Sequence, residues 1–290
     1  MAVTRSLILN ALVPESVLDE KVFRESLEIL QKTKVKAIEF YAPFDTAVER
    51  NHIMRDMGFG KTIYLIAGRQ KGERKWLNAL DEVERQKAMD LTKEALEVAL
   101  KGGYNGFLIT SGAMVEEAKK EASLDQLERS IEELYAICGR DIDMYIEPGD
   151  TTVDACQLIG PIGEAAAFAE RIRNKNPNFY LTLDTSHIAQ LGERFDSAFA
   201  LGKATSNHLH LASCILKKDH PFYGDKHPLF SNPDGVYTSN ALKHVMNRVV
   251  AAYEEEGRDL TVGVEIIDRS GKRMGSLEEA MAESPWFFME

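Results

Sequence analysis

Residues 179–187 contain the stretch that decides the fold, Phe179-Tyr180-Leu181-Thr182-Leu183-Asp184-Thr185-Ser186-His187. Its aromatic, aliphatic and β-branched residues predict a short buried strand. Asp184 ends that strand, and His187 follows three residues later. A carboxylate at a strand end and an imidazole in the next turn can share a metal ion or a substrate. The same pattern also occurs in purely structural turns, so the other strand ends decide its meaning.

Seven further stretches have the composition of strands, and stretches with helical spacing of apolar residues separate them. The other predicted strands are Arg5–Asn10, Val35–Phe40, Thr62–Ala67, Gly106–Thr110, Asp143–Glu147, Ser206–Leu211 and Leu260–Glu265. The predicted helices are Glu20–Lys34, Asp45–Met57, Val83–Lys101, one that opens at Ser123, Gly163–Arg173, Ser197–Leu201, Asn240–Glu254 and Leu277–Met281. Ser123 and Gln126 have the spacing of a capping box at the start of their helix.

Eight strands that alternate with helices predict an α/β protein with the (β/α)8 TIM barrel fold. A doubly wound sheet is the alternative, but its dinucleotide-binding form needs a GxGxxG motif, which the sequence lacks. No linker-like or low-complexity segment divides the chain. We therefore predict a single domain over residues 1–290.

The length, composition and net charge of the chain disfavour several classes of protein. A chain of 290 residues with 44% hydrophobic and 28% charged residues is typical of a globular protein with a sizeable core. The net charge of −11 disfavours nucleic acid and anionic membranes as partners. No apolar run approaches the roughly 18 residues of a membrane span, and the N-terminus has no basic region followed by an apolar segment. Three scattered cysteines argue against a disulfide framework, so we expect a cytoplasmic protein.

The predicted strand ends carry the candidate site, because the carboxyl ends of barrel strands form the active face. Four consecutive strands supply Glu147, Asp184, His210 and Glu265 there. Pro148 keeps Glu147 extended, since a residue before proline avoids the helical region. Three carboxylates and one imidazole suit one divalent cation in an open site. We expect Mn²⁺ first, with Mg²⁺, Co²⁺ and Zn²⁺ as alternatives.

These residues also carry a resemblance. Tyr145-Ile-Glu147-Pro, Leu183-Asp184-Thr-Ser-His187, His208-Leu-His210 and Val264-Glu265 resemble, in order along nearly the whole chain, the motifs of the xylose isomerase-like barrels, specifically the sugar phosphate isomerases and epimerases. The resemblance implies that Glu147, Asp184, His210 and Glu265 are metal ligands. It also implies that the two glutamates are an acid/base pair and that His187 binds substrate.

Two positions depart from subfamilies of this kind. Ketose 3-epimerases have an arginine six residues after the metal histidine, where this chain has Leu216. The related endonuclease has further zinc-binding histidines after its third and fourth strands, where this chain has Gly68-Arg69 and Thr110-Ser111. The pattern therefore disfavours a nuclease.

The surroundings of the site give further expectations. Asp225-Lys-His227-Pro, in the long loop 212–238, resembles the Asp-x-His-x-Pro loop of the family, and we expect Asp225 and His227 to bind substrate. Arg69 is a further candidate for substrate binding, with Tyr41 and Phe44 as pocket walls, in a basic stretch, 69–75, that is otherwise typical of a surface loop. We predict that His208 faces away from the lumen in a structural role. We expect the apolar tail, 285–289, to pack on its own barrel; packing on a second subunit of a homo-oligomer is the alternative.

The function predicted from these features is a metal-dependent isomerase or epimerase of a keto-sugar, cyclitol or sugar phosphate. One glutamate would remove a proton next to a carbonyl and the other would return it. The same layout supports a lyase or dehydratase that eliminates hydroxide from a keto-sugar or keto-inositol. An endonuclease-type hydrolase and a non-catalytic sugar-binding barrel are the remaining alternatives, and the second would be expected to lack one or more of the four ligands.

Overall fold

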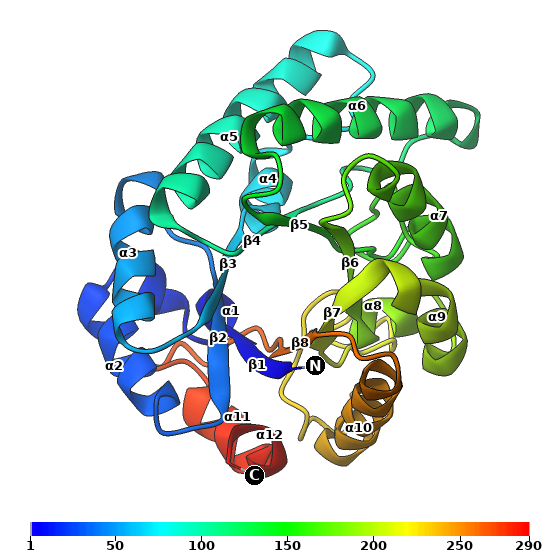
Figure 1. The fold of residues 1–290 in the computed structure, drawn as a ribbon. Coiled ribbons are helices and arrows are strands. Elements are labelled where there is room, and N and C mark those ends of the chain that lie inside the picture. Colours follow the sequence, from blue (N-terminus) through cyan, green and yellow to red (C-terminus); the bar gives the residue numbers. More distant parts are fainter. Residues whose placement is uncertain (1, 290) are drawn as a thin grey trace.

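The computed structural model describes residues 2–289 and contains a closed barrel of parallel strands in the order β1-β2-β3-β4-β5-β6-β7-β8. Figure 1 shows the strands as an inner ring with most helices outside it. Every strand pairs in parallel with its sequence neighbours, and β1 closes the ring by pairing with β8. The predicted (β/α)8 TIM barrel is confirmed.

The strands agree closely with the predicted ranges. They are β1 (Val3–Ile8), β2 (Val35–Phe40), β3 (Lys61–Leu65), β4 (Gly106–Ile109), β5 (Asp143–Ile146), β6 (Phe179–Asp184), β7 (Ser206–Leu211) and β8 (Leu260–Val264).

The helices follow the strands as the barrel requires. They are α1 (Leu9–Leu12), α2 (Glu20–Leu30), α3 (Phe44–Asp56), α4 (Ala67–Glu73), α5 (Glu82–Gly102), α6 (Lys120–Cys138), α7 (Ile162–Arg173), α8 (Thr185–Gln190), α9 (Phe195–Gly202), α10 (Ser239–Glu255), α11 (Leu277–Glu283) and α12 (Pro285–Phe288). No helix within residues 2–289 is long and apolar enough to cross a membrane.

Polar side chains close the end of the barrel where the strands begin. Lys61, the first residue of β3, donates hydrogen bonds to the Tyr145 hydroxyl (3.2 Å) and to Thr261 Oγ1 (2.9 Å). Ile63, Leu108 and Tyr145 form a small apolar cluster of their own, while the main core includes apolar residues of the surrounding helices. The larger cavity lies at the opposite end, where the strands finish.

Three local predictions were wrong. Leu9 and Asn10 begin α1 and do not extend β1, and the basic stretch expected to be a loop lies mostly in α4. Helix α6 begins at Lys120, so Ser123 is inside the helix and caps nothing. Its buried hydroxyl instead donates to the Asn78 carbonyl oxygen (2.9 Å) and accepts from Asn78 Nδ2 (2.9 Å). This contact between distant segments replaces the local capping box.

The C-terminal tail packs on its own barrel, as expected. Trp286, Phe287 and Phe288 are buried against β1 and the end of α2. Arg5 Nη1 donates to the carbonyl oxygens of Trp286 (3.2 Å) and Phe287 (2.7 Å), and the Lys34 amide donates to the Phe288 carbonyl (2.6 Å). These contacts join the two ends of the chain.

Candidate metal centre and its cavity

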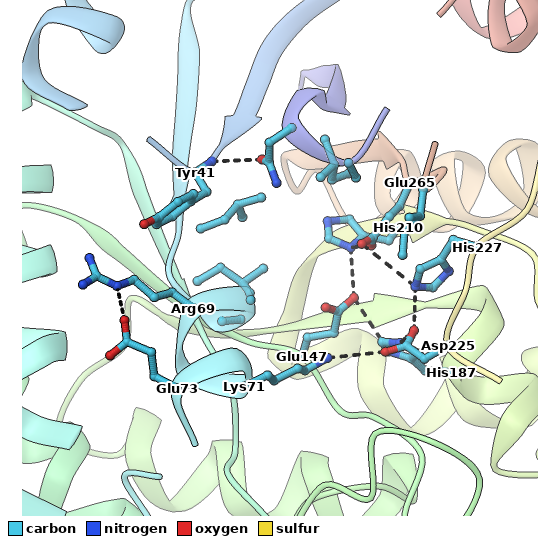
Figure 2. A pocket seen from close by; sticks show the side chains of 18 residues that line it. Tyr41, Arg69, Lys71, Glu73, Glu147, His187, His210, Asp225, His227 and Glu265 are labelled. Carbon is cyan, nitrogen blue, oxygen red and sulfur yellow. Dashed lines mark hydrogen bonds and ion pairs between the residues drawn. The ribbon is translucent and has the colours of Figure 1, made fainter. Parts of the chain in front are cut away.

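A cavity of about 680 Å³ opens at the carboxyl ends of the strands. Figure 2 shows the polar side chains that line it, which come from the ends of several strands, from the helices α4 and α8 and from the long loop 212–238. The side chains that matter for chemistry are Tyr41, Arg69, Lys71, Glu147, His187, His210, Asp225, His227 and Glu265. Every site residue predicted from the sequence except Asp184 lines this cavity, and Asp184 lies buried beside it.

The four predicted metal ligands come together. Glu147 directly follows β5, Asp184 ends β6, His210 lies in β7, and Glu265 directly follows β8. His210 Nδ1 lies 2.9 Å from Glu147 Oε1 and 3.0 Å from Glu265 Oε2. One ligand atom from each of the four side chains lies within 4.8 Å of the others. The group, which we call the quartet, has the donor set of a site for a divalent cation.

Two buried oxygens of the quartet have no hydrogen-bond partner among the described residues. Asp184 caps α8 with Oδ1, which accepts from the amides of Ser186 (2.6 Å) and His187 (2.9 Å), and its Oδ2 is buried without a partner. Glu265 Oε2 is likewise buried without one, because its approach to His210 does not have hydrogen-bond geometry. Buried carboxylate oxygens are costly when unpaired. A cation between them would satisfy both, so the quartet fits a metal ion.

Glu39, inside β2, contacts the Nε2 atom of His210, whereas two carboxylates of the quartet lie at Nδ1. Its Oε2 accepts from His210 Nε2 (3.0 Å), while Oε1 accepts from His208 Nε2 (2.9 Å) and Ser6 Oγ (2.6 Å). Because a carboxylate only accepts and both His210 nitrogens face one, both carry a proton in the metal-free site; a cation at the quartet would replace the proton on Nδ1, while Glu39 would keep the one on Nε2. Gly263 leaves room for this contact, since a Cβ there would lie 2.7 Å from Glu39 Oε1.

Electrostatics agree with this arrangement. Burial alone would raise the pKa of Glu39, but His208 and His210 outweigh it and hold that pKa well below its usual value. Burial alone would lower the pKa of His210, but Glu39, Glu147 and Glu265 raise it well above the usual value. The carboxylates therefore create a strongly negative potential at the quartet, which attracts a cation.

The prediction that His208 faces away from the lumen was wrong. Residues two apart in a strand point to the same face, so His208 and His210 both point inward to Glu39. His208 Nδ1 also pairs with Thr182 Oγ1 (2.9 Å), and the ring is fully buried beneath the cavity. Its role is nevertheless structural, because it does not line the cavity.

A second cluster lies beside the quartet and consists of His187, Asp225 and His227, which we call the trio. Asp225 Oδ1 lies 3.0 Å from His187 Nε2 and 2.7 Å from His227 Nε2. The other ring nitrogens also have partners, since His187 Nδ1 donates to the Pro148 carbonyl (3.1 Å) and His227 Nδ1 lies 3.1 Å from Ser186 Oγ. His187 and the two residues of the long loop, Asp225 and His227, were each predicted to bind substrate. The structure joins them in one hydrogen-bonded group.

Backbone geometry turns His227 into the cavity. Its φ of 36° is in the left-handed region, which is uncommon for a residue other than glycine and is often found at functional sites. The Ile267 amide donates to the His227 carbonyl oxygen (2.9 Å) and ties the loop to the segment after β8.

The trio also has strongly shifted pKa values. Burial would lower the pKa of both imidazoles, but Asp184 and Asp225 raise that of His187 to about 10. Glu265 and Asp225 raise the pKa of His227 to about 9. In the protonated state, which these raised pKa values favour, both nitrogens of each imidazole carry a hydrogen and face a neighbouring residue.

Helix α4 brings two cations to the cavity, on different sides. Gln70 fixes the helix, because its Nε2 donates to Thr92 Oγ1 (3.0 Å) and its Oε1 accepts from the Thr110 amide (3.0 Å). Figure 2 shows Lys71 directed toward Asp225 and Arg69 directed away from it, toward Glu73. Lys71 Nζ lies 3.4 Å from Asp225 Oδ2.

Arg69 is therefore apart from the trio, although both were predicted to bind substrate. Its Nε donates to Glu73 Oε1 (2.7 Å), and its guanidinium lies 4.4 Å from the centre of the Phe44 ring. Arg69 and Tyr41 line the far wall of the cavity, as predicted. Phe44, the other predicted wall residue, does not line it, because its ring packs against the Arg69 guanidinium.

Sequence reasoning missed Glu39 and Lys71. Glu39 has a detectable signal, because it is the one acidic residue in the strand Val35–Phe40, where a buried charge needs partners. Lys71 has none, since it is one of several basic residues in the stretch 69–75.

Taken together, a TIM barrel with carboxylate and imidazole ligands at its strand ends is the architecture of metal-dependent barrel enzymes. Residues 27–232 match the model of the xylose isomerase-like TIM barrel family, and the chain belongs to that family. No curated protein sequence matches the chain.

Solved structures of the same fold cover nearly the whole chain. The Escherichia coli 3-keto-D-glucoside 4-epimerase is similar with a TM-score of 0.65 and 14% identity over 99% of this chain and 98% of its own. The IolI protein with a bound zinc atom is similar with a TM-score of 0.68 and 16% identity, over 98% of this chain and 96% of its own. The D-psicose 3-epimerase of Clostridium cellulolyticum, solved with D-tagatose, is similar with a TM-score of 0.61 and 15% identity, over 97% of this chain and 91% of its own. At these identities the similarity shows a shared fold.

Proposed function

We propose that the protein is a divalent-metal-dependent isomerase or epimerase of a keto-sugar, cyclitol or sugar phosphate. The observation that carries the proposal is the quartet, in which Asp184 Oδ2 and Glu265 Oε2 are buried without partners at the open end of a barrel. Two of the similar structures are sugar epimerases and a third contains a bound zinc atom, which supports this class of substrate and a bound metal.

Glu147, Asp184, His210 and Glu265 would hold the cation, with Mn²⁺ as the first expectation. A bound divalent ion supplies positive charge that stabilises the negative charge developing on substrate oxygens during enolisation. Glu39 accepts from His210 Nε2 and would hold the proton there, so that Nδ1 would give up its proton and bind the cation.

Glu147 and Glu265 would carry out the proton transfers. They approach His210 Nδ1 from β5 and β8, which lie on either side of β6 and β7 in the barrel. One glutamate would remove the proton from the carbon next to the carbonyl, and the other would return a proton to the opposite face. The trio would orient the substrate, a substrate oxygen sharing with Asp225 the Nε2–H groups of His187 and His227, and Arg69 would contact the far end of the substrate.

Elimination of hydroxide from a keto-sugar or keto-inositol is the second candidate. The observation that favours it is that the imidazoles of His187 and His227 line the cavity beside the quartet; neighbouring carboxylates outweigh burial and raise their pKa values to about 10 and about 9, so each ring can donate a proton. A leaving hydroxyl group needs such a donor.

Three further assignments belong to this proposal. Cys138, Cys156 and Cys214 are free thiols, which suits a reducing compartment and hence the cytoplasm. We expect a single domain over residues 1–290, and a homo-oligomer remains an expectation from the sequence.

Exchange of solvent deuterium into substrate tests the proposal. The protein would be loaded with Mn²⁺ and incubated in deuterium oxide with ketoses, keto-inositols and their phosphates. We expect deuterium to enter at the carbon next to the carbonyl of at least one compound, with loss of exchange in a His210→Ala variant. Exchange that persists at full rate in the variant would contradict the proposal, whereas product with a lost hydroxyl group would select the elimination.

A further inference from the structure

The trio has the donor set of a second metal site. His187 and His227 both direct Nε2 at Asp225 Oδ1, and one ligand atom from each of the three residues lies within 4.8 Å of the others. Both Nδ1 atoms pair with groups outside the cluster, the Pro148 carbonyl and Ser186 Oγ, which is how metal-binding histidines are usually oriented. Two imidazoles and a carboxylate form a ligand set that suits Zn²⁺.

One feature separates the trio from an ordinary zinc site. The ammonium of Lys71 lies 3.4 Å from Asp225 Oδ2, the carboxylate oxygen that does not contact the histidines. Ammonium and metal ion would repel each other at such a distance. Among the described residues no lysine or arginine forms an ion pair with a quartet carboxylate: Arg69 is paired with Glu73 (2.7 Å), and Lys71 interacts with Glu147 and Glu265 only at longer range than with Asp225.

The position of Lys71 is built into the fold. Gln70, the preceding residue, is fully buried and joins α4 to Thr92 and to the Thr110 amide. The Asp225 side of the ion pair is also anchored, since Asp154 Oδ2 accepts from the Asp225 amide (3.1 Å) and from Lys226 Nζ (2.6 Å). The two charges are therefore held opposite each other by separate contacts, although the Lys71 side chain is 34% exposed.

We propose that Lys71 is a built-in cation that occupies the charge position of a second metal ion and keeps the trio metal-free. The chain would then bind one divalent ion, at the quartet, while the imidazoles of the trio keep their Nε2–H groups, which a substrate oxygen would share with Asp225. The use of those N–H groups rests on the proposed function; the exclusion of a second ion does not. Lys71 is thus a residue that sets metal stoichiometry.

Zn²⁺ binding to the purified, metal-free full-length protein tests this inference. Lys71→Met removes the charge and keeps a side chain of similar length. We expect the wild type to bind one equivalent and Lys71→Met to bind two, with affinity at the second site raised roughly 100-fold or more, because a neighbouring positive charge has been removed. Calorimetric titration and elemental analysis after dialysis against fixed free Zn²⁺ both report the count.

Matched variants assign the second ion. Lys71→Arg keeps the charge and should bind one equivalent, as should Arg69→Met, which removes a cation from the same helix. The double variant Lys71→Met with Asp225→Asn should return to one equivalent. Lys71→Met with His210→Ala should keep only the ion at the trio.

The outcomes separate this inference from the proposed function. A single equivalent in Lys71→Met would overturn the inference, and so would a second equivalent in the wild type that Asp225→Asn removes. If the quartet binds no Zn²⁺ while Lys71→Met gains an ion that Asp225→Asn removes, the inference stands and the proposed metal centre fails.

Discussion

The quartet and the trio are two groups of histidines and carboxylates at the same end of one barrel. Asp184 Oδ2 and Glu265 Oε2 of the quartet have no hydrogen-bond partner in the described chain, and no lysine or arginine is paired with the quartet there. Imidazole nitrogens have protein partners in both clusters, but no buried polar side-chain atom of the trio is without a partner among the described residues, and Asp225 also faces Lys71. The comparison teaches that residue types alone do not define a metal site: unpaired oxygens and the charge balance distinguish one cluster from the other.

Removal of the metal should have the largest effect. Treatment with a chelator should leave a folded protein without measurable turnover, because the charge that stabilises the developing oxyanion is lost. Turnover should return with Mn²⁺ or another divalent ion. Elemental analysis and circular dichroism before and after treatment check the metal content and the fold. Full activity in a protein shown to be metal-free would place the chemistry outside the quartet.

Replacement of either glutamate of the quartet by glutamine should have the next largest effect. Glu147→Gln and Glu265→Gln each keep an oxygen ligand and remove the base, so turnover should fall by about 10²–10⁴ while metal remains bound, with weaker affinity. Deuterium exchange on each face of the substrate reports which base is missing, since exchange at the opposite face can persist. Normal turnover and exchange on both faces in Glu265→Gln would rule out the two-base scheme.

Substitution of a residue of the trio should reduce activity less than substitution of a quartet glutamate. His227→Ala removes one donor to the substrate, so kcat/KM should fall by about 10- to 100-fold, the cost of one charge-assisted hydrogen bond. The matched control is His220→Ala, because His220 belongs to the same long loop but does not line the cavity. Equal losses in the two variants would mean that loop structure, rather than substrate contact, is responsible.

The smallest effect concerns stability and pH in the metal-free protein. His187 and His227 have folded-state pKa values of about 10 and about 9, raised from 6.5 because Asp184, Glu265 and Asp225 outweigh burial. A raised pKa stabilises the fold fully below the unfolded value and ceases to do so as pH rises through the folded value. The Tm should therefore fall between pH 7 and 10, and by less in His227→Ala. Parallel pH curves for the two proteins would contradict the shift.

The sequence predicted the barrel well because its strands are short, apolar and regularly spaced. The ranges of β2 and β7 agree with the prediction at both ends. The quartet was predictable for a related reason, since each ligand directly ends or lies in a recognisable strand, and consecutive strands of a barrel are neighbours.

The features that were predicted wrongly or not at all depend mostly on contacts between segments that are far apart in the sequence. Ser123 and the residues of α4 owe their structure to contacts with Asn78, Thr92 and the Thr110 amide, which are remote in sequence. Lys71 resembles any surface lysine until α4 and the long loop are placed opposite each other. The error at His208 was one of strand periodicity, because residues two apart share a face.

Metal content in His210→Ala and His227→Ala tests the central claim most directly, because each variant removes one imidazole from one cluster. Both proteins would be purified in parallel with the wild type, exposed to the same free Mn²⁺ and examined by elemental analysis, with circular dichroism to confirm folding. We predict about one ion per chain in the wild type and in His227→Ala, and little in His210→Ala. Wild-type metal content in His210→Ala, or loss of the metal in His227→Ala, would contradict the assignment of the ion to the quartet.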